Sequence, residues 1–187
     1  MSQANAMLLQ KEAATFRFLR NPRVLALSGR FFLYSQVTLM IILDKFGDPW
    51  NIIKLQTTLD PGEFQLLLHS QGVEGLAAWI RHYLIDFFYP IFYGVFLAAM
   101  LVRWPPSRND KLLKLVLIVP LLAGLFDEIE NVCQLLLALE RVPIDSIYFY
   151  VGAASARLKW SMLLTTLVLI ILGGMAHRAN AGRPEGA

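Results

Sequence analysis

The sequence predicts an all-α polytopic membrane protein: a bundle of four transmembrane helices with a short amphipathic helix in the first loop. The first observation behind this is composition. Of the 187 residues, 56% are hydrophobic and 17% charged, whereas soluble domains have about 45–50% apolar and about 25% charged residues. The second is that the apolar residues gather in four long runs, each near the roughly 20 residues that a helix needs to cross a bilayer. The runs leave no room for a separate soluble domain.

The four predicted spans are residues 24–46, 80–102, 112–139 and 147–174. They form one transmembrane domain, residues 24–174, between an N-terminal tail (1–23) and a C-terminal tail (175–187). The N-terminal tail mixes arginines with apolar side chains, so we expect either a helix lying on the membrane surface or an irregular tail. It lacks the apolar core and cleavage site of a signal peptide, which predicts that the first span is retained.

Basic residues outside the spans predict the orientation. Ten lysines and arginines lie in the two tails and the loop between the second and third spans, and four lie in the other two loops with their span ends. By the positive-inside rule, both termini are expected in the cytoplasm, with the protein in the cell inner membrane. The same residues explain the net charge of +3. A nucleic-acid partner is not expected, because no basic stripe with interleaved aromatic residues occurs.

The loop between the first and second spans carries a helix-start signature. Asp60 supplies an N-cap oxygen, Pro61 suits the first helical position, and Glu63 adds a carboxylate near the positive end of the helix dipole. The pattern predicts an amphipathic helix over residues 61–71 that stops at Gly72.

Three carboxylates interrupt the third span. Asp127, Glu130, Asn131 and Gln134 are spaced i, i+3, i+4 and i+7, which places all four on one helix face, whereas Glu128 points elsewhere. A bilayer core offers no water to a charge, so such residues are costly unless they are paired or lie in a wet cavity. This stretch is therefore the first place to look for chemistry.

The second span has a matching polar face. His82, Asp86, Tyr89, Pro90 and Tyr93 share one side of the helix. Pro90 cannot donate a hydrogen bond to the carbonyl of Asp86, which predicts a kink there. The freed carbonyl would add another polar group to the interior.

The other two spans carry the cations. In the fourth span Lys159 lies on a stripe with Ser155 and Thr166, and Arg157 lies off it; in the first span Arg30 and Tyr34 align with Thr38. At a rise of about 1.5 Å per residue, Asp127 and Lys159 come to similar depths, as do Glu130 and Arg157. Four unpaired charges there would cost on the order of 10 kcal/mol. We therefore expect pairing across the bundle.

Two interpretations of this polar core stay open. It is either an ion network that fixes the register of the helices or a pocket that binds a ligand. A ligand pocket is favoured because the polar faces carry more hydrogen-bonding groups than an ion network needs to fix the register of the helices. We assign catalytic roles to four residues. Asp127 and Glu130 form an acid/base pair, Lys159 tunes this pair, and Asp86 is a further catalytic carboxylate. The expected ligand-binding residues are Tyr89, Tyr93, Asn131, His82 and Gln134.

The function expected from such a pocket is binding of a lipid- or isoprenoid-like small molecule, with acid/base conversion of that molecule as a further option, so enzyme activity stays open. The alternatives are a proton- or ion-coupled carrier subunit, which would have to form a homo-oligomer, and a non-catalytic membrane assembly protein. A metal site of Asp127, Glu130, Asp86 and His82 is a weaker alternative, because no Glu-x-x-His pattern occurs. No metal and no cofactor is predicted, and membrane lipids are the expected partners.

A resemblance rests on residues between Gly72 and Lys159, roughly half of the chain. They are Gly72, Gly75, Tyr83, Asp86, Tyr89-Pro90, Tyr93-Gly94, Pro120, Gly124, Asp127, Glu130-Asn131 and Lys159. With this pattern the chain resembles a recurring group of small four-span membrane proteins, whose most specific element is Asp-x-x-Glu-Asn. The resemblance implies a four-helix fold with polar residues facing inward, and no activity. The chain is more loosely similar to the sterol-isomerase and sigma-2-receptor superfamily, from which no residue is carried over.

Overall fold

The computed structural model describes residues 14–44, 48–107 and 109–181, and these residues form helices joined by short turns. The parts of the predicted tails in residues 1–13 and 182–187, and the end of the predicted first span, lie outside the described residues. A short helix over residues 14–20 comes first. The others are α2 (Pro22–Leu43), α3 (Pro49–Thr57), α4 (Pro61–Ser70), α5 (Gly72–Asp86), α6 (Tyr89–Arg103), α7 (Asp110–Ala138) and α8 (Ile147–Ala181).

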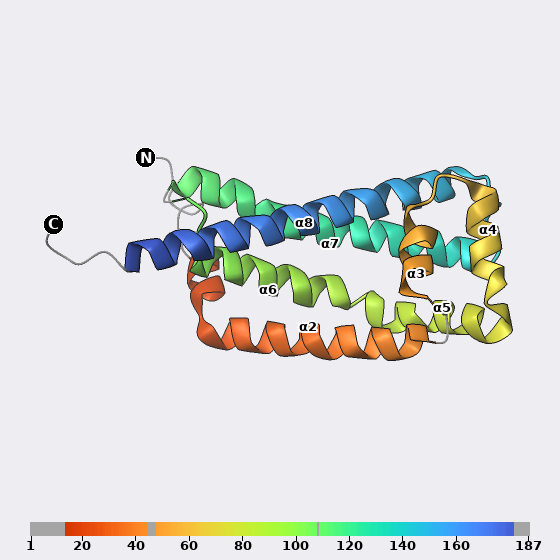
Figure 1. Ribbon diagram of the computed structural model, residues 1–187, viewed down its shortest axis with the longest axis horizontal. Coiled ribbons are helices and arrows are strands. Elements are labelled where there is room, and N and C mark those ends of the chain that lie inside the picture. Colours follow the sequence, from red (N-terminus) through yellow and green to blue (C-terminus); the bar gives the residue numbers. More distant parts are fainter. Residues whose placement is uncertain (1–13, 45–47, 108, 182–187) are drawn as a thin grey trace, which may run out of the picture.

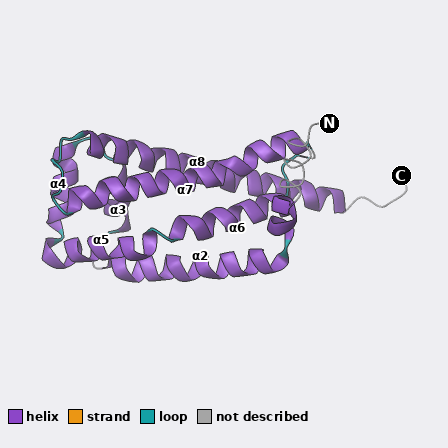
Figure 2. Ribbon diagram, turned by 180° about the vertical axis from the view of Figure 1, so that it is seen from behind, coloured by secondary structure: helices purple, strands orange, loops and turns teal. Residues whose placement is uncertain are grey.

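The long helices lie side by side along one axis, and α3 and α4 lie across one end of them (Figure 1). Helix α7 packs against α8 and α6, while α2 packs against α6 and α5; α3 packs against α8. The view from behind shows the same bundle (Figure 2). Helix 14–20 and the end of α8 lie at the end opposite α3 and α4. We call that end the basic end, because Arg17, Arg20, Arg103, Lys111 and Arg178 lie there.

Two helices, α2 and α8, are long and apolar enough to cross a membrane, and α5 with α6 makes a third if this bent pair counts as one span. Large apolar side chains are exposed along the sides of the bundle, among them Leu33 and Ile41 on α2 and Leu164 on α8. Such an exposed belt is typical of a protein that sits in lipid. Helix α7 has 29 residues, but Asp127, Glu128 and Glu130 interrupt its apolar sequence. The chain is therefore an all-helical membrane protein with two to three candidate spans.

The second predicted span, residues 80–102, is not one helix as expected. It is divided into α5 and α6, which meet at an angle of 50°. The break falls at Phe87 and Phe88, directly before Pro90, so the predicted kink is confirmed and is stronger than a bend within a helix. Helix α5 also begins earlier than predicted, at Gly72, whose φ of 67° suits the sharp turn out of α4.

The signature at Asp60 is confirmed. Its side chain accepts hydrogen bonds from the backbone of Gly62 and Glu63, and α4 runs from Pro61 to Ser70. Asp48 begins α3 in the same way, since its carboxylate accepts a hydrogen bond from the backbone of Trp50 at 2.9 Å. This helix was not predicted, although Asp48 and Pro49 repeat the Asp-Pro pattern.

The polar stripe predicted on the first span faces outward and not toward the other helices. Arg30 is exposed and Tyr34 is 69% exposed, so both lie on the outer surface of α2. The polar side chains that α2 turns toward the other helices are Ser28, Ser35 and Gln36. Spacing identifies residues that share a face, but it does not say whether that face is turned toward the bundle.

Two apolar clusters hold the bundle. One fills the basic end and includes Leu19, Ala98, Leu101, Leu113 and Ile170. The other lies beneath α3 and α4 and includes Leu55, Phe64, Trp79, Leu137 and Phe149. The polar face of α7 lies between these clusters.

Candidate functional site

The centre of the site is an ion cluster between α7 and α8. The Lys159 ammonium lies 2.9 Å from Oδ1 of Asp127 and 2.6 Å from Oε2 of Glu130. All three side chains are buried, and Glu130 has no exposed surface. The expected pairing across the bundle is therefore present for Asp127, Glu130 and Lys159. Arg157 does not take part, because its Nε donates a hydrogen bond to the carbonyl of Thr57 at the end of α3.

Hydrogen bonds extend this cluster onto α5 and α6. Tyr93 donates to Oδ2 of Asp127 at 3.0 Å, so both oxygens of this carboxylate have a partner. Gln134 donates to Glu130 at 3.3 Å and accepts from Tyr83 at 3.4 Å. Each of these bonds joins groups that are buried, where an unpaired polar atom would be costly. The network therefore fixes the positions of the two carboxylates on α7.

Asp86 is a third buried carboxylate, and it is held less tightly. Its Oδ2 lies 3.8 Å from Nε2 of His82, one turn earlier on α5, and the other ring nitrogen of His82 contacts the backbone carbonyl of Trp79. The buried amide nitrogen of Asn131 has no well-formed hydrogen bond in the described part of the chain. Asn131 is a hydrogen-bonding neighbour of Asp86, and of the described carboxylates in the cluster Asp86 is the one that has no short ion pair.

A cavity of about 600 Å³ reaches this cluster. Its polar floor includes Asp86, His82, Asp127, Lys159 and Tyr89. The walls are mainly apolar and come from three helices. They are Leu39, Met40 and Leu43 of α2, Ile52 and Ile53 of α3, and Trp160 and Leu163 of α8, with Gln36, Asp44 and Gln56 between them. A cavity of this size and lining falls in the range of small-molecule sites.

The local packing explains why these groups converge. A Cβ on Gly124 would lie 3.4 Å from Cβ of Pro90, which is an ordinary contact distance, so α7 passes close to α6 at the level of the bend. The close approach predicted at Gly124 is therefore present, although a small side chain would also fit there. The bend places Asp86 at the end of α5 and Tyr89 at the start of α6, and the Tyr89 hydroxyl donates to Gln36 of α2 at 2.5 Å. Four helices are thereby joined around the cavity.

The structure brings all nine predicted site residues together, but not in equal roles. Asp86, Asp127, Lys159, Tyr89 and His82 line the cavity. Tyr93, Glu130, Asn131 and Gln134 lie behind them and are almost fully buried. Glu128 is on another side of α7 and is half-buried. Among the described residues no group of three metal-ligating side chains is arranged to hold a metal ion.

Several residues of the site were missed. Gln36 and Asp44 come from α2, where the wrong face was chosen, and Gln56 comes from the unpredicted α3. Tyr83 reaches Gln134 from α5, although it lies outside the stripe of His82 and Asp86. The Asp-Pro signature at Asp48 is the one sequence signal that could have placed Gln56 on a helix.

The apolar cluster of Ala98, Ala99, Leu117 and Ile170 lies between the carboxylates and the basic end. The lining of the cavity includes Gln56 of α3, and none of these four apolar residues is part of the described lining. Within the described structure the cavity therefore lies on the α3 side of this cluster.

Comparisons with known proteins add no relative to this description. The chain matches no family model, and neither a curated protein nor a solved structure is similar to it at a significant level. The arguments on function therefore rest on the residues of the site and their geometry.

Proposed function

We propose that this protein binds an amphipathic, lipid- or isoprenoid-like small molecule in the cavity above Asp86, Asp127 and Lys159, and that these groups can exchange protons with it. The observation that carries the proposal is the division of the cavity into apolar walls and a polar, ionisable floor. The walls suit a hydrocarbon body, and the floor suits one polar group at its end.

The packing of the helices supports entry from the membrane. Helix α2 packs against α5 and α6, whereas α8 packs against α7 and α3, and in the described part α2 does not pack closely against α8. The wall residues Met40 of α2 and Trp160 of α8 are both partly exposed. An opening between these two helices would let a molecule dissolved in the bilayer reach the cavity without crossing water.

The charges of the floor support acid/base chemistry. Three carboxyl groups share one ammonium, which is already bound by Asp127 and Glu130. A surplus carboxyl group in an apolar setting can carry a proton and pass it to a bound molecule. Asp86 is placed to do this because it faces the cavity and lacks a cationic partner within hydrogen-bond distance. Glu130 would then hold Lys159 in place rather than touch the ligand.

We also propose that the chain crosses the cell inner membrane four times and that both termini face the cytoplasm. Helix α7 would be the additional span, although its charged residues keep it from meeting the criteria for a candidate span. The basic end supports this orientation, because Arg17, Arg20, Arg103 and Arg178 lie there, while Asp48, Asp60 and Asp145 lie at or near the other end. A reporter enzyme fused after Ala187 should be active only in the cytoplasm; activity on the other side would overturn the orientation.

The apolar cluster around Leu117 and Ile170 favours this function over a proton- or ion-coupled carrier. A carrier needs alternating access from both sides of the membrane. Here the cluster lies between the carboxylates and the basic end. A carrier would need a polar path through this cluster.

The test is native mass spectrometry of the intact protein released from a mild detergent. We expect a bound mass that matches a lipid or isoprenoid, and we expect Asp86→Asn to lose it while Asp145→Asn, an exposed acid in the α7–α8 turn, keeps it. A clean apo mass after incubation with an extract of the native membrane would remove the ligand-binding proposal, and equal retention by both variants would show that Asp86 does not hold the ligand. A folded Asp86→Asn protein that binds ligand but loses a cellular phenotype would assign Asp86 to conversion instead.

A further inference from the structure

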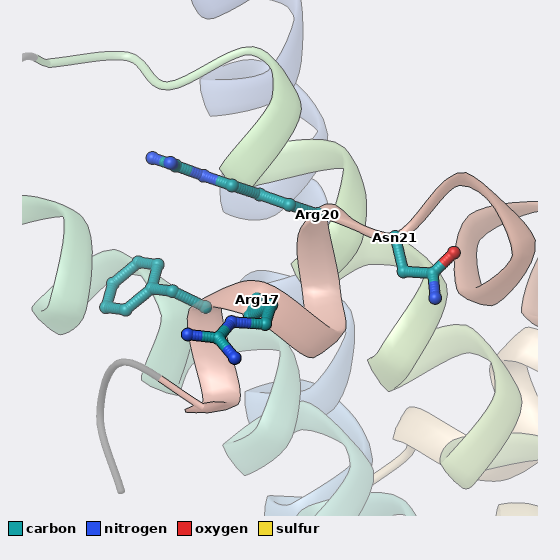
Figure 3. Close-up of a pocket in the computed structure, with 4 residues that line it drawn as sticks. Arg17, Arg20 and Asn21 are labelled. Atoms are coloured by element: carbon teal, nitrogen blue, oxygen red, sulfur yellow. The ribbon is translucent and has the colours of Figure 1, made fainter. Parts of the chain in front are cut away.

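A second hollow lies at the basic end of the molecule, far from the ion cluster in the sequence and in the fold. It has a volume of about 600 Å³ and is lined, in the described part, by Phe16, Arg17, Arg20 and Asn21. Figure 3 shows Arg17 and Arg20 reaching to one side of the short helix 14–20, where residues three apart share a face.

The short helix is fixed to the bundle rather than detached from it. Leu19 is 8% exposed and belongs to the apolar cluster with Leu101, Leu113 and Ile170, and Phe16 packs against that cluster. Asn21 then accepts a hydrogen bond from the backbone of Arg23 and starts α2. The position of the two arginines is therefore set by the packed side of their own helix.

The guanidinium groups of Arg17 and Arg20 are exposed and make no hydrogen bond or ion pair within the residues that the structure describes. Other cations lie at the same end, including Arg23 at the start of α2, Arg103 at the end of α6 and Arg178 in the last turn of α8. Such a concentration of cations attracts an anion. Guanidinium groups match the paired oxygens of phosphate in particular.

We propose that the hollow at Arg17 and Arg20 binds the phosphate group of an anionic phospholipid. A phosphate monoester or a free phosphate ion shares this chemistry, but two features favour a lipid. The hollow lies at the end of helices that carry an exposed apolar belt, which is where a bilayer places its headgroups. Phe16 offers an apolar surface beside the two cations, as the glycerol and first methylenes of a lipid require.

This site is independent of the cavity above Asp86. It would tie helix 14–20 to the membrane surface and fix the depth at which α2 enters the bilayer. Juxtamembrane basic residues each strengthen binding to anionic lipid roughly five-fold, since each contributes about 1 kcal/mol near the surface.

The experiment is lipid binding measured by native mass spectrometry on the full chain, with phosphatidylglycerol and phosphatidylcholine titrated separately. We expect preferential binding of phosphatidylglycerol, and we expect Arg17→Gln with Arg20→Gln to weaken it by at least ten-fold while leaving phosphatidylcholine unchanged. The matched control is Arg81→Gln with Arg141→Gln, two exposed arginines nearer the α3–α4 end, which should keep the preference. Unchanged thermal unfolding of both double variants confirms that the fold is intact.

Two outcomes would overturn the proposal. Equal binding of both lipids by the wild type, or an equal loss in the two double variants, would show that the arginines make no specific site. Displacement of phosphatidylglycerol by inorganic phosphate at low millimolar concentration would assign the hollow to free phosphate and remove the lipid.

Discussion

Glu130 on α7 has no exposed surface, and its Oε2 lies 2.6 Å from the ammonium of Lys159 on α8. Replacing Lys159 with methionine leaves two carboxylates buried without their cation, so we expect the free energy of unfolding to fall by about 3–5 kcal/mol. Adding Glu130→Gln to that variant should restore part of the loss, because one of the two uncompensated charges is removed. Thermal or denaturant unfolding in detergent measures both effects.

The matched control is Lys54→Met. Lys54 also forms an ion pair, at 3.2 Å from Glu63, but its side chain is exposed. Exposed pairs contribute about 0–1 kcal/mol, so this variant should be close to wild type. Strictly additive effects of Lys159→Met and Glu130→Gln would show that the two side chains are not coupled.

Gly173 and Gly174 offer a test of the packing between α8 and the α6–α7 connection. A Cβ on Gly173 would clash with the backbone oxygen of Trp104, whereas a Cβ on Gly174 would meet nothing within 4 Å. We expect Gly173→Ala to destabilise by roughly 1–3 kcal/mol, as overpacking does. Gly174→Ala should be neutral or stabilise by up to about 1 kcal/mol, because alanine favours helix. Equal melting temperatures for the two variants would refute this contact.

Arg157 holds the end of α3 beside the cavity. Its Nε donates to the carbonyl of Thr57 at 2.8 Å, and Trp160 Nε1 donates to Gln56 nearby at 3.4 Å. Without Arg157, amide hydrogen exchange in α3 should become several-fold faster, since a bond of about 1 kcal/mol is lost. Arg81→Gln is the control, because Arg81 bonds to Ala77 of its own helix. Unchanged exchange in Arg157→Gln would mean that α3 is held by other contacts.

The turn between α3 and α4 should respond to acid through Glu63. The hydrogen bond from the Thr58 hydroxyl, at 2.5 Å, and the nearby Lys54 ammonium favour the ionised carboxylate and lower the pKa of Glu63 below its ordinary value of 4.5. The contribution of these contacts is therefore complete above pH 4.5 and is lost as the pH falls through the lowered pKa of the folded protein.

Hydrogen exchange of the 58–63 turn as a function of pH measures this effect. In wild type the turn should loosen only in the acid range below the ordinary pKa of a glutamate. In Glu63→Gln the profile should lack this step, because the amide does not titrate. A step at the ordinary glutamate value in wild type would show that Thr58 and Lys54 do not stabilise the carboxylate.

The helical class and the polar cluster could be predicted from the sequence because they depend on short-range periodicity. Asp127 and Glu130 share a face of their helix whichever way that helix is turned. Pro90 interrupts its helix whatever the helix packs against. The Asp-Pro pair at Asp60 likewise acts within one turn. These features need no knowledge of the neighbouring helices.

The cavity could not be predicted because it depends on how the helices face one another. Arg30 and Tyr34 form as regular a stripe as His82 and Asp86, yet they lie on the outer surface of α2. Gln36 lines the cavity and binds the hydroxyl of Tyr89, a contact between residues 53 positions apart. That α7 crosses the membrane also stays a prediction, because a helix with this many charges has the composition of a buried helix in a soluble protein.

The 50° bend between α5 and α6 is held from two sides. Helix α2 packs against both α5 and α6, and α7 also contacts both of them. Asp86 is the last residue of α5, so its distance from Asp127 on α7 and Lys159 on α8 depends on this bend. The two neighbouring helices therefore act as a brace that sets the spacing of the polar groups.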